Sequence, residues 1–308
     1  MDRSNLPPDK YQPGATGPSM RRHLDTSGAL SAFLALPGFV CSLIVMSFIG
    51  AAALPNVSWL PPVLWILSGA VLVLPSIEPT VSRLLFGMRP PDPHELGALT
   101  SPWQSVCQVA GVDAARYVLM VEDTDELNAS AAGARTVSVT RSAVRLPPKQ
   151  LEAVLAHELG HHLSGHPVVS MLAWWYALPA RGAAFLVGLT VRFVLAVGRV
   201  FAAFRNGIGA LVMLMLALMI FVMFAFVGVW LLLVPLTAPL LAWASRLGET
   251  RADRTAALLG YGPHLIDVLH IWINRAGRRV RGGGLRERLL STHPSHADRI
   301  RSLHEFLR

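Results

Sequence analysis

Long uncharged apolar runs are the strongest feature of the hydropathy pattern. Leu30–Leu54 has no charged residue over 25 positions, which as a helix is enough to cross a hydrocarbon core about 30 Å thick. Trp59–Ile77 is a second uncharged run. Together they predict a transmembrane hairpin over residues 30–87. The segment before it, 1–29, is rich in Pro, Gly and polar residues and is predicted to be a disordered tail.

A second apolar block follows over residues 168–244. Ile208–Ser245 has 38 uncharged residues and as a helix would reach about 57 Å, which exceeds the thickness of a bilayer. Part of it is expected to project from the membrane. Val168–Ala203 is interrupted by three arginines, so it either crosses the membrane or lies in part at the interface. The pattern predicts a membrane hairpin over this block.

Between the two apolar blocks, residues 88–167 have the mixed pattern of a small α+β domain. Trp103–Ala110 reads as a helix ended by a glycine, and Tyr117–Val121 as a strand. Asn128–Gly133 reads as a turn of small residues. Thr136–Thr140 alternates valines with polar residues, which predicts a half-exposed strand.

That alternating strand suggests a place for substrate. A strand at a sheet edge can pair with the backbone of an extended peptide, and Val137 and Val139 would then contact it. We group Asn128 with them as a candidate substrate contact. An ordinary structural edge strand fits the same pattern, and the sequence leaves the two interpretations open.

Composition supports a membrane protein. Of 308 residues 53% are hydrophobic and only 15% are charged, which is too apolar for an ordinary soluble chain. The net charge of +8 comes with no basic face of the kind that reads nucleic acid. Two cysteines imply no disulfide framework.

The basic residues near the first hairpin predict its orientation. Arg21 and Arg22 precede the first run, Arg83 and Arg89 follow the second, and the connection 55–62 has no charge. Basic residues favour the cytoplasmic side. The segment after the hairpin is therefore predicted to be cytoplasmic, in a multi-pass protein of the cell membrane.

The segment 156–162 contains a His-Glu-x-x-His pattern within a predicted helix. Residues four apart on a helix share a face, so His157 and His161 can bind one metal ion. Glu158 follows the first ligand and can reach a water on that metal, where it would act as the catalytic base. His162 points about 100° away and is not counted as a ligand.

A second segment downstream completes the predicted site. A catalytic zinc ion needs three protein ligands and an open fourth position, and Glu249 is the natural third ligand. Asp253 lies one helical turn further and can accept the second ring N–H of a ligating histidine. The sequence predicts one zinc ion per chain.

The His-Glu-x-x-His pattern on a helix is typical of zinc peptidases, so residues 88–167 and 245–308 are expected to form the two halves of a protease domain. A helix is predicted over Pro263–Arg275, and a Gly-rich basic segment, Arg275–Gly284, reads as a flexible loop or as a contact with anionic lipid. A last helix follows. His293 and Arg299 are candidates to stabilise an oxyanion or to support the metal ligands, and local capping or pairing is the alternative for both.

With these residues, the chain resembles HtpX-type membrane zinc metalloproteases, a family that also includes the CAAX prenyl endoprotease. The matching pieces are Asn128-Ala129 before Gly133, the Val137 strand, Leu151–His161, Ser245-Arg246 with Glu249, Ala252-Asp253, Thr292-His293-Pro294 and Arg299-Ile300. Two positions depart from the family pattern: Thr250 replaces a frequent aromatic residue, and His162 adds an imidazole.

The resemblance implies an α-helical multi-pass membrane protein with an α+β zincin-like metalloprotease domain. It implies a zinc endopeptidase with a cytoplasmic active site, acting on membrane or misfolded proteins, with His157, His161 and Glu249 as ligands and Glu158 as base. Three alternatives stay open: a sensor-transducer that cleaves one regulator, a prenyl-protein endoprotease, and a non-catalytic scaffold that carries zinc.

Overall fold

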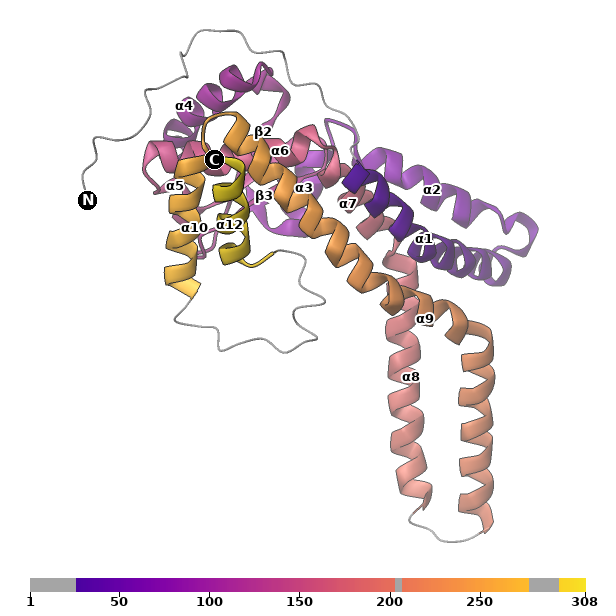
Figure 1. The fold of residues 1–308 in the computed structure, drawn as a ribbon. Helices are drawn as coiled ribbons and strands as arrows, with labels where there is room; N and C mark the ends of the chain where they lie inside the picture. Colours follow the sequence, from indigo (N-terminus) through magenta and orange to yellow (C-terminus); the bar gives the residue numbers. More distant parts are fainter. Residues whose placement is uncertain (1–25, 203–206, 277–293) are drawn as a thin grey trace, which may run out of the picture. The chain divides into compact units, whose positions relative to one another are not determined.

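The computed structural model describes residues 26–202, 207–276 and 294–308. The chain forms two compact units. Of the described residues, the first comprises 26–28, 75–168, 245–276 and 294–308, and the second comprises 29–74, 169–202 and 207–244. The helices described are α1 (Thr26–Ala53), α2 (Leu60–Leu72), α3 (Glu78–Phe86), α4 (Pro93–Ala110), α5 (Arg141–Val144), α6 (Pro148–Leu163), α7 (His166–Tyr176), α8 (Leu178–Ala202), α9 (Gly207–Leu258), α10 (Gly262–Ala276) and α12 (His296–Phe306) (Figure 1).

The first unit contains a four-stranded sheet in the order β1-β2-β4-β3. The strands are β1 (Met88–Arg89), β2 (Val118–Glu122), β3 (Ala129–Ala132) and β4 (Thr136–Thr140). β4 pairs in parallel with β2 and antiparallel with β3, and β1 pairs antiparallel with β2. β3 is therefore an edge strand, with β4 on one side and no other strand of the described residues on the other.

The expectation of a half-exposed edge strand at Thr136–Thr140 is wrong. β4 is an inner strand, and all five of its residues are buried. Val137 and Val139 face the hydrophobic core, while the side chain of Thr136 bonds to buried groups on the opposite face. The alternation of valine with Thr and Ser reflects two buried faces of different polarity. The segment expected to be a turn contains the edge strand β3.

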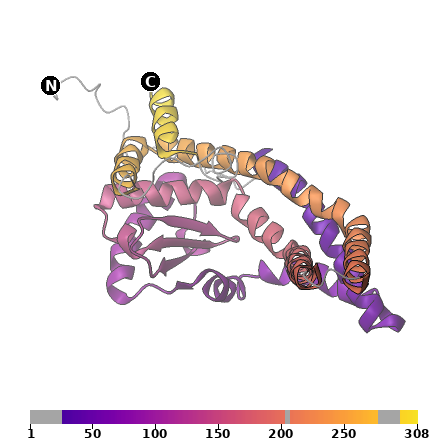
Figure 2. The same ribbon diagram turned by 90° about the horizontal axis from the view of Figure 1, so that it is seen from below.

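Helices cover one face of the sheet. The core combines leucines of α4, α6 and α10 with the inward valines of β2 and β4. Figure 2 shows the pink helix α6 along the sheet, with the orange α10 and yellow α12 beyond it. α6 contacts β3, α4 and α10, so the helix with the His-Glu-x-x-His pattern lies at the centre of this unit.

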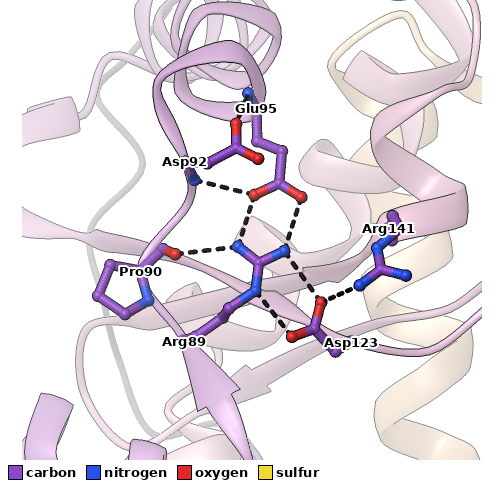
Figure 3. A network of polar contacts seen from close by, with 6 residues as sticks. All are labelled: Arg89, Pro90, Asp92, Glu95, Asp123 and Arg141. Atoms are coloured by element: carbon purple, nitrogen blue, oxygen red, sulfur yellow. Dashed lines mark hydrogen bonds and ion pairs between the residues drawn. The ribbon is translucent and has the colours of Figure 1, made fainter.

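A polar network ties the edge of the sheet to α4 (Figure 3). Arg89 of β1 donates to both carboxylate oxygens of Glu95, at 2.6 and 2.8 Å, and to both of Asp123, at 2.9 and 3.0 Å. Asp123 also accepts from Arg141. Glu95 and Asp92 form a capping box at the start of α4. The network joins β1, the end of β2 and the first turns of α4 and α5.

The second unit consists of helices joined by aromatic and polar contacts. Trp175 stacks on Trp65 with ring centroids 4.9 Å apart, and its indole N–H donates to Ser68 at 2.9 Å. Tyr176 donates its hydroxyl to the Ile66 carbonyl at 2.6 Å. These contacts join α2 to the end of α7. Gly69 permits this approach, because a Cβ there would lie 1.9 Å from the Tyr176 hydroxyl.

Among the described residues, two helical segments are long and apolar enough to cross a membrane: Gly28–Ala53 and Leu178–Val200. The second predicted span is shorter than expected, because α2 ends at Leu72 and Pro75 separates it from α3. Residues 75–87 belong to the sheet-containing unit, although the sequence placed them in the first hairpin.

Some predictions fall partly or wholly on other residues. The tail expected over 1–29 lies outside the described residues up to position 25, and Thr26 already belongs to α1. The Gly-rich segment after Ala276 and His293 also lie outside them. The helix predicted over Pro263–Arg275 is confirmed as α10.

Candidate metal centre

The helix α6 is buried from Leu151 to Leu163. Its close neighbour is the last part of α9, and a glycine makes the approach possible. A Cβ on Gly160 would lie 2.9 Å from the Cα of Ala252 and 3.0 Å from the Cβ of Thr255. Any larger residue at 160 would push the two helices apart. Sequence analysis overlooked Gly160, although a glycine in a helix interior signals close packing.

The three predicted metal ligands converge. The distance from His161 Nε2 to Glu249 Oε1 is 3.4 Å, and that from His157 Nε2 to Glu249 Oε2 is 3.6 Å. One ligand atom from each residue lies within 4.8 Å of the others, and all three residues are buried. Zinc bonds of about 2.0–2.1 Å in a tetrahedron put ligand atoms about 3.3 Å apart. The two imidazoles and the carboxylate therefore fit a zinc ion.

A second set of contacts orients the first ligand. His157 donates its Nδ1 hydrogen to Asp253 Oδ1 at 2.9 Å, which leaves Nε2 facing Glu249. Arg299 holds Asp253 through two hydrogen bonds of 2.6 and 2.9 Å, and its Nη1 lies 3.4 Å from Glu249. Asp253 thus lies where the sequence predicted it, and Arg299 contacts it directly. A carboxylate in this position fixes the histidine tautomer and raises its basicity.

Burial and charge act against each other in this cluster. Burial lowers the pKa of His157, and Arg299 lowers it further, but Asp253 and Glu249 raise it to about 10. Burial lowers the pKa of His161. Burial raises the pKa of Asp253, while Arg299 and His157 lower it to about 2. Without metal, Asp253 is therefore an anion, and it pairs with Arg299.

Glu158 lies next to His157 on α6 and is also buried, with 5% exposure. Burial lowers the pKa of Arg299, whereas the carboxylates of Asp253, Glu249 and Glu158 raise it. Glu158 is thus one of three buried carboxylates that favour the charged form of Arg299. Trp272 of α10 lies under the Arg299 guanidinium, with 5.7 Å to the ring centre. Trp272 was not predicted from the sequence, because its position in the chain follows no spacing rule for a metal site.

His162 lies away from the three ligands, as its helical position predicted. Its Nε2 is 3.0 Å from the carbonyl oxygen of Thr136, at the start of β4, and its ring meets Tyr117 edge to face at 5.2 Å. The extra imidazole joins α6 to the sheet.

The predicted substrate contacts do not gather at the site. Val137 and Val139 are core residues with 0% and 1% exposure, so they cannot contact a peptide. Asn128 lies just before β3, and its backbone is paired with Thr140 in both directions. His293 lies outside the described residues.

Two histidines one helical turn apart, met by a carboxylate from another helix, form a site of the metallopeptidase class. The sequence model of peptidase family M48 matches residues 93–307, which include His157, His161 and Glu249. The chain belongs to peptidase family M48. The resemblance to HtpX-type proteases is confirmed at this level.

Among solved structures, the crystal structure of S. mikatae Ste24p is similar to this chain, with a TM-score of 0.49 and 18% sequence identity. The match covers 85% of this chain and 61% of that one, so this chain spans less than two thirds of that protein's length. No curated protein matches the sequence.

Proposed function

We propose that this chain is a zinc-dependent endopeptidase embedded in a membrane. The observation that supports it most is the convergence of His157, His161 and Glu249, with 3.4 and 3.6 Å between the imidazole and carboxylate atoms. Only nitrogen and oxygen donors meet there, as in catalytic zinc sites with an open fourth position.

In this proposal each residue of the site has its own role. His157, His161 and Glu249 would hold a zinc ion, which would supply Lewis acidity and make a water bound to it more acidic. Glu158 takes a proton from the attacking water and returns it to the leaving amine. Asp253 holds the Nδ1 hydrogen of His157, and Arg299 holds Asp253. His293 remains a candidate to stabilise the oxyanion.

The substrate backbone is proposed to pair with β3. An antiparallel ladder alternates residues that bond to their partner with residues that point outward. Thr140 N–H donates to the Asn128 carbonyl at 3.0 Å, so the backbone groups of Asn128 point toward β4. By the alternation, the backbone groups of Ser130 and Ala132 also point toward β4. The N–H and C=O groups of Ala129 and Ala131 then point outward, away from β4. β3 packs against α6. An extended peptide added there would lie along the helix that carries His157 and His161.

The proposed setting is a cell membrane, with the catalytic unit on the cytoplasmic side. The apolar segments Gly28–Ala53 and Leu178–Val200 support membrane insertion, and Arg83 and Arg89 after the second apolar run support the orientation. The proposed substrates are membrane or misfolded proteins. The two halves of the protease domain would then flank the membrane segment 168–244.

The test is casein cleavage by the full-length chain in detergent, beside the Glu158→Gln variant. The wild type should cleave, a chelator should stop it, and the variant should lose about 10²–10⁴-fold in kcat while keeping its zinc. A chain that holds zinc but cleaves nothing would be a scaffold. Undiminished cleavage by the zinc-loaded variant would contradict the role of Glu158.

The edge strand has its own test. Ala131→Pro removes an outward N–H and leaves the bonds to β4 in place, as proline is tolerated on the open side of an edge strand. We expect a higher KM for casein with an unchanged zinc content. The matched control, Ala132→Pro, removes an N–H that faces β4 and should lower the melting temperature. An unchanged KM in Ala131→Pro would place the substrate elsewhere.

A further inference from the structure

A buried carboxylate from α3 closes the turn between β3 and β4. Glu78, the first residue of α3, has 0% exposure. Its Oε1 accepts from the backbone N–H of Arg135 at 2.8 Å and of Thr136 at 3.0 Å, and its Oε2 accepts from Ala134 N–H at 3.0 Å. The Thr136 hydroxyl lies 3.1 Å from Oε1. Three consecutive backbone donors thus converge on one carboxylate.

The turn is built around this carboxylate. Residues 133–135 connect β3 to β4. Gly133 has a φ of +56°, and a Cβ there would lie 2.6 Å from the Glu78 Cδ. Only glycine satisfies both the backbone conformation and the close approach. A buried charge is costly unless hydrogen bonds compensate it, and four do so here.

The turn fixes one end of the edge strand. Ala132, the last residue of β3, precedes Gly133 directly. The other end is fixed by Asn128, whose N–H donates to the Thr140 hydroxyl at 3.1 Å and whose carbonyl accepts from Thr140 N–H. Between these two anchors lie Ala129 and Ala131, whose outward groups we assign to substrate. β3 is therefore held at both ends against the inner strand.

We infer that Glu78 is a positioning residue for the peptide substrate. It holds β3 in the place and register where the strand can pair with an extended backbone beside α6. Glu78 lies before residue 93, outside the part of the chain that peptidase family M48 matches. This inference rests on the proposed function, because it needs β3 to bind substrate.

The test measures casein cleavage by full-length Glu78→Ala in detergent, with zinc content and melting temperature measured beside it. We expect KM to rise about three- to tenfold, as when about one hydrogen bond is lost from binding. The value of kcat should stay within about twofold and zinc at the wild-type level, because His157, His161 and Glu249 keep their places.

Two further variants keep the test informative if Glu78→Ala folds poorly. Glu78→Gln presents an amide N–H₂ to Ala134 N–H and should raise KM less. Gly133→Ala brings a methyl group against the carboxylate and should raise KM by a second route. In the double variant Glu78→Ala/Gly133→Ala, the added methyl group no longer meets a carboxylate. The rise in KM of the double variant should therefore be smaller than the product of the rises in the two single variants.

A purely structural role predicts a lower melting temperature with unchanged KM, and this result would overturn the inference. A fall of kcat and zinc content together with KM would also overturn it, since the whole site would then depend on Glu78. A wild-type chain without casein cleavage contradicts the proposed function as well. An active wild type with an unchanged KM in Glu78→Ala contradicts the role of Glu78 alone.

Discussion

The first unit contains two charge networks of similar composition and different surroundings. In the metal centre, Arg299 and Asp253 are buried to 5% and 3% exposure. In the network of Figure 3, the side chains of Arg89 and Asp123 are 31% and 49% exposed. Both arginines make paired bonds to a carboxylate. The degree of burial sets how much stability is lost when one partner of a pair is removed.

In the buried network, removing one partner leaves a charge without compensation in a region of low polarity, which costs several kcal/mol. In the network of Figure 3, Arg89 and Asp123 reach solvent, so water can replace a lost partner there, and surface pairs of this kind contribute little. Glu95 is buried, with 7% exposure, but without Arg89 it still accepts from the backbone N–H of Asp92 at 2.9 Å. We therefore expect the metal centre to depend on each member and the surface network to tolerate loss.

The largest effect on stability is expected for Arg299→Ala. It leaves Asp253 buried beside His157 without its cation, at a cost of about 3–5 kcal/mol. Zinc affinity should fall about 10–100-fold, the usual effect of losing support for a metal ligand. Thermal unfolding in detergent and competition with a zinc-binding dye measure the two effects. Wild-type values for both would show that the buried pair contributes nothing.

A smaller effect is expected for Arg89→Ala. The change removes the link between β1, Glu95 and Asp123, and we expect a loss of about 1 kcal/mol, or about 2 °C in melting temperature. Zinc content and casein cleavage should not change. A loss as large as that of Arg299→Ala would contradict the contrast between the networks.

The smallest effect is expected on the pH dependence of stability. Arg89 lowers the pKa of Glu95 through its hydrogen bonds. A carboxyl group whose folded pKa lies below its unfolded value stabilises the protein above the unfolded value, about 4.3 for glutamate, and this contribution is lost as the pH falls. The melting temperatures of wild type and Glu95→Gln should differ at pH 7 and converge between about pH 5 and pH 3. A difference that stays constant would mean that the charge of Glu95 has no part in it.

The sequence predicted the residues of the metal site well and the contacts between distant segments less well. His157, His161, Glu249 and Asp253 were found because a metal site demands fixed residue types at fixed helical spacing. Gly160 and Glu78 were missed, because their value depends on what lies opposite them in space. A glycine or a glutamate has no spacing rule that reveals a close contact with a distant segment.

The sheet shows why strand environment is hard to predict. Thr136–Thr140 alternates in polarity like a strand with one face in water, yet both faces are buried. The polar face is satisfied in part by Glu78 and Ser82, which come from α3 and precede the strand by more than 50 residues. The small residues of β3 gave no strand signal, since alanine and serine have little preference for strands.

The central claim is that two imidazoles and one carboxylate hold a single zinc ion. The most direct measurement is the zinc content of the purified full-length chain by mass spectrometry, wild type beside Glu249→Gln. We predict one zinc per wild-type chain and less than about a tenth of that in the variant, because two histidines alone bind zinc weakly. Equal zinc content in the two proteins would contradict the claim.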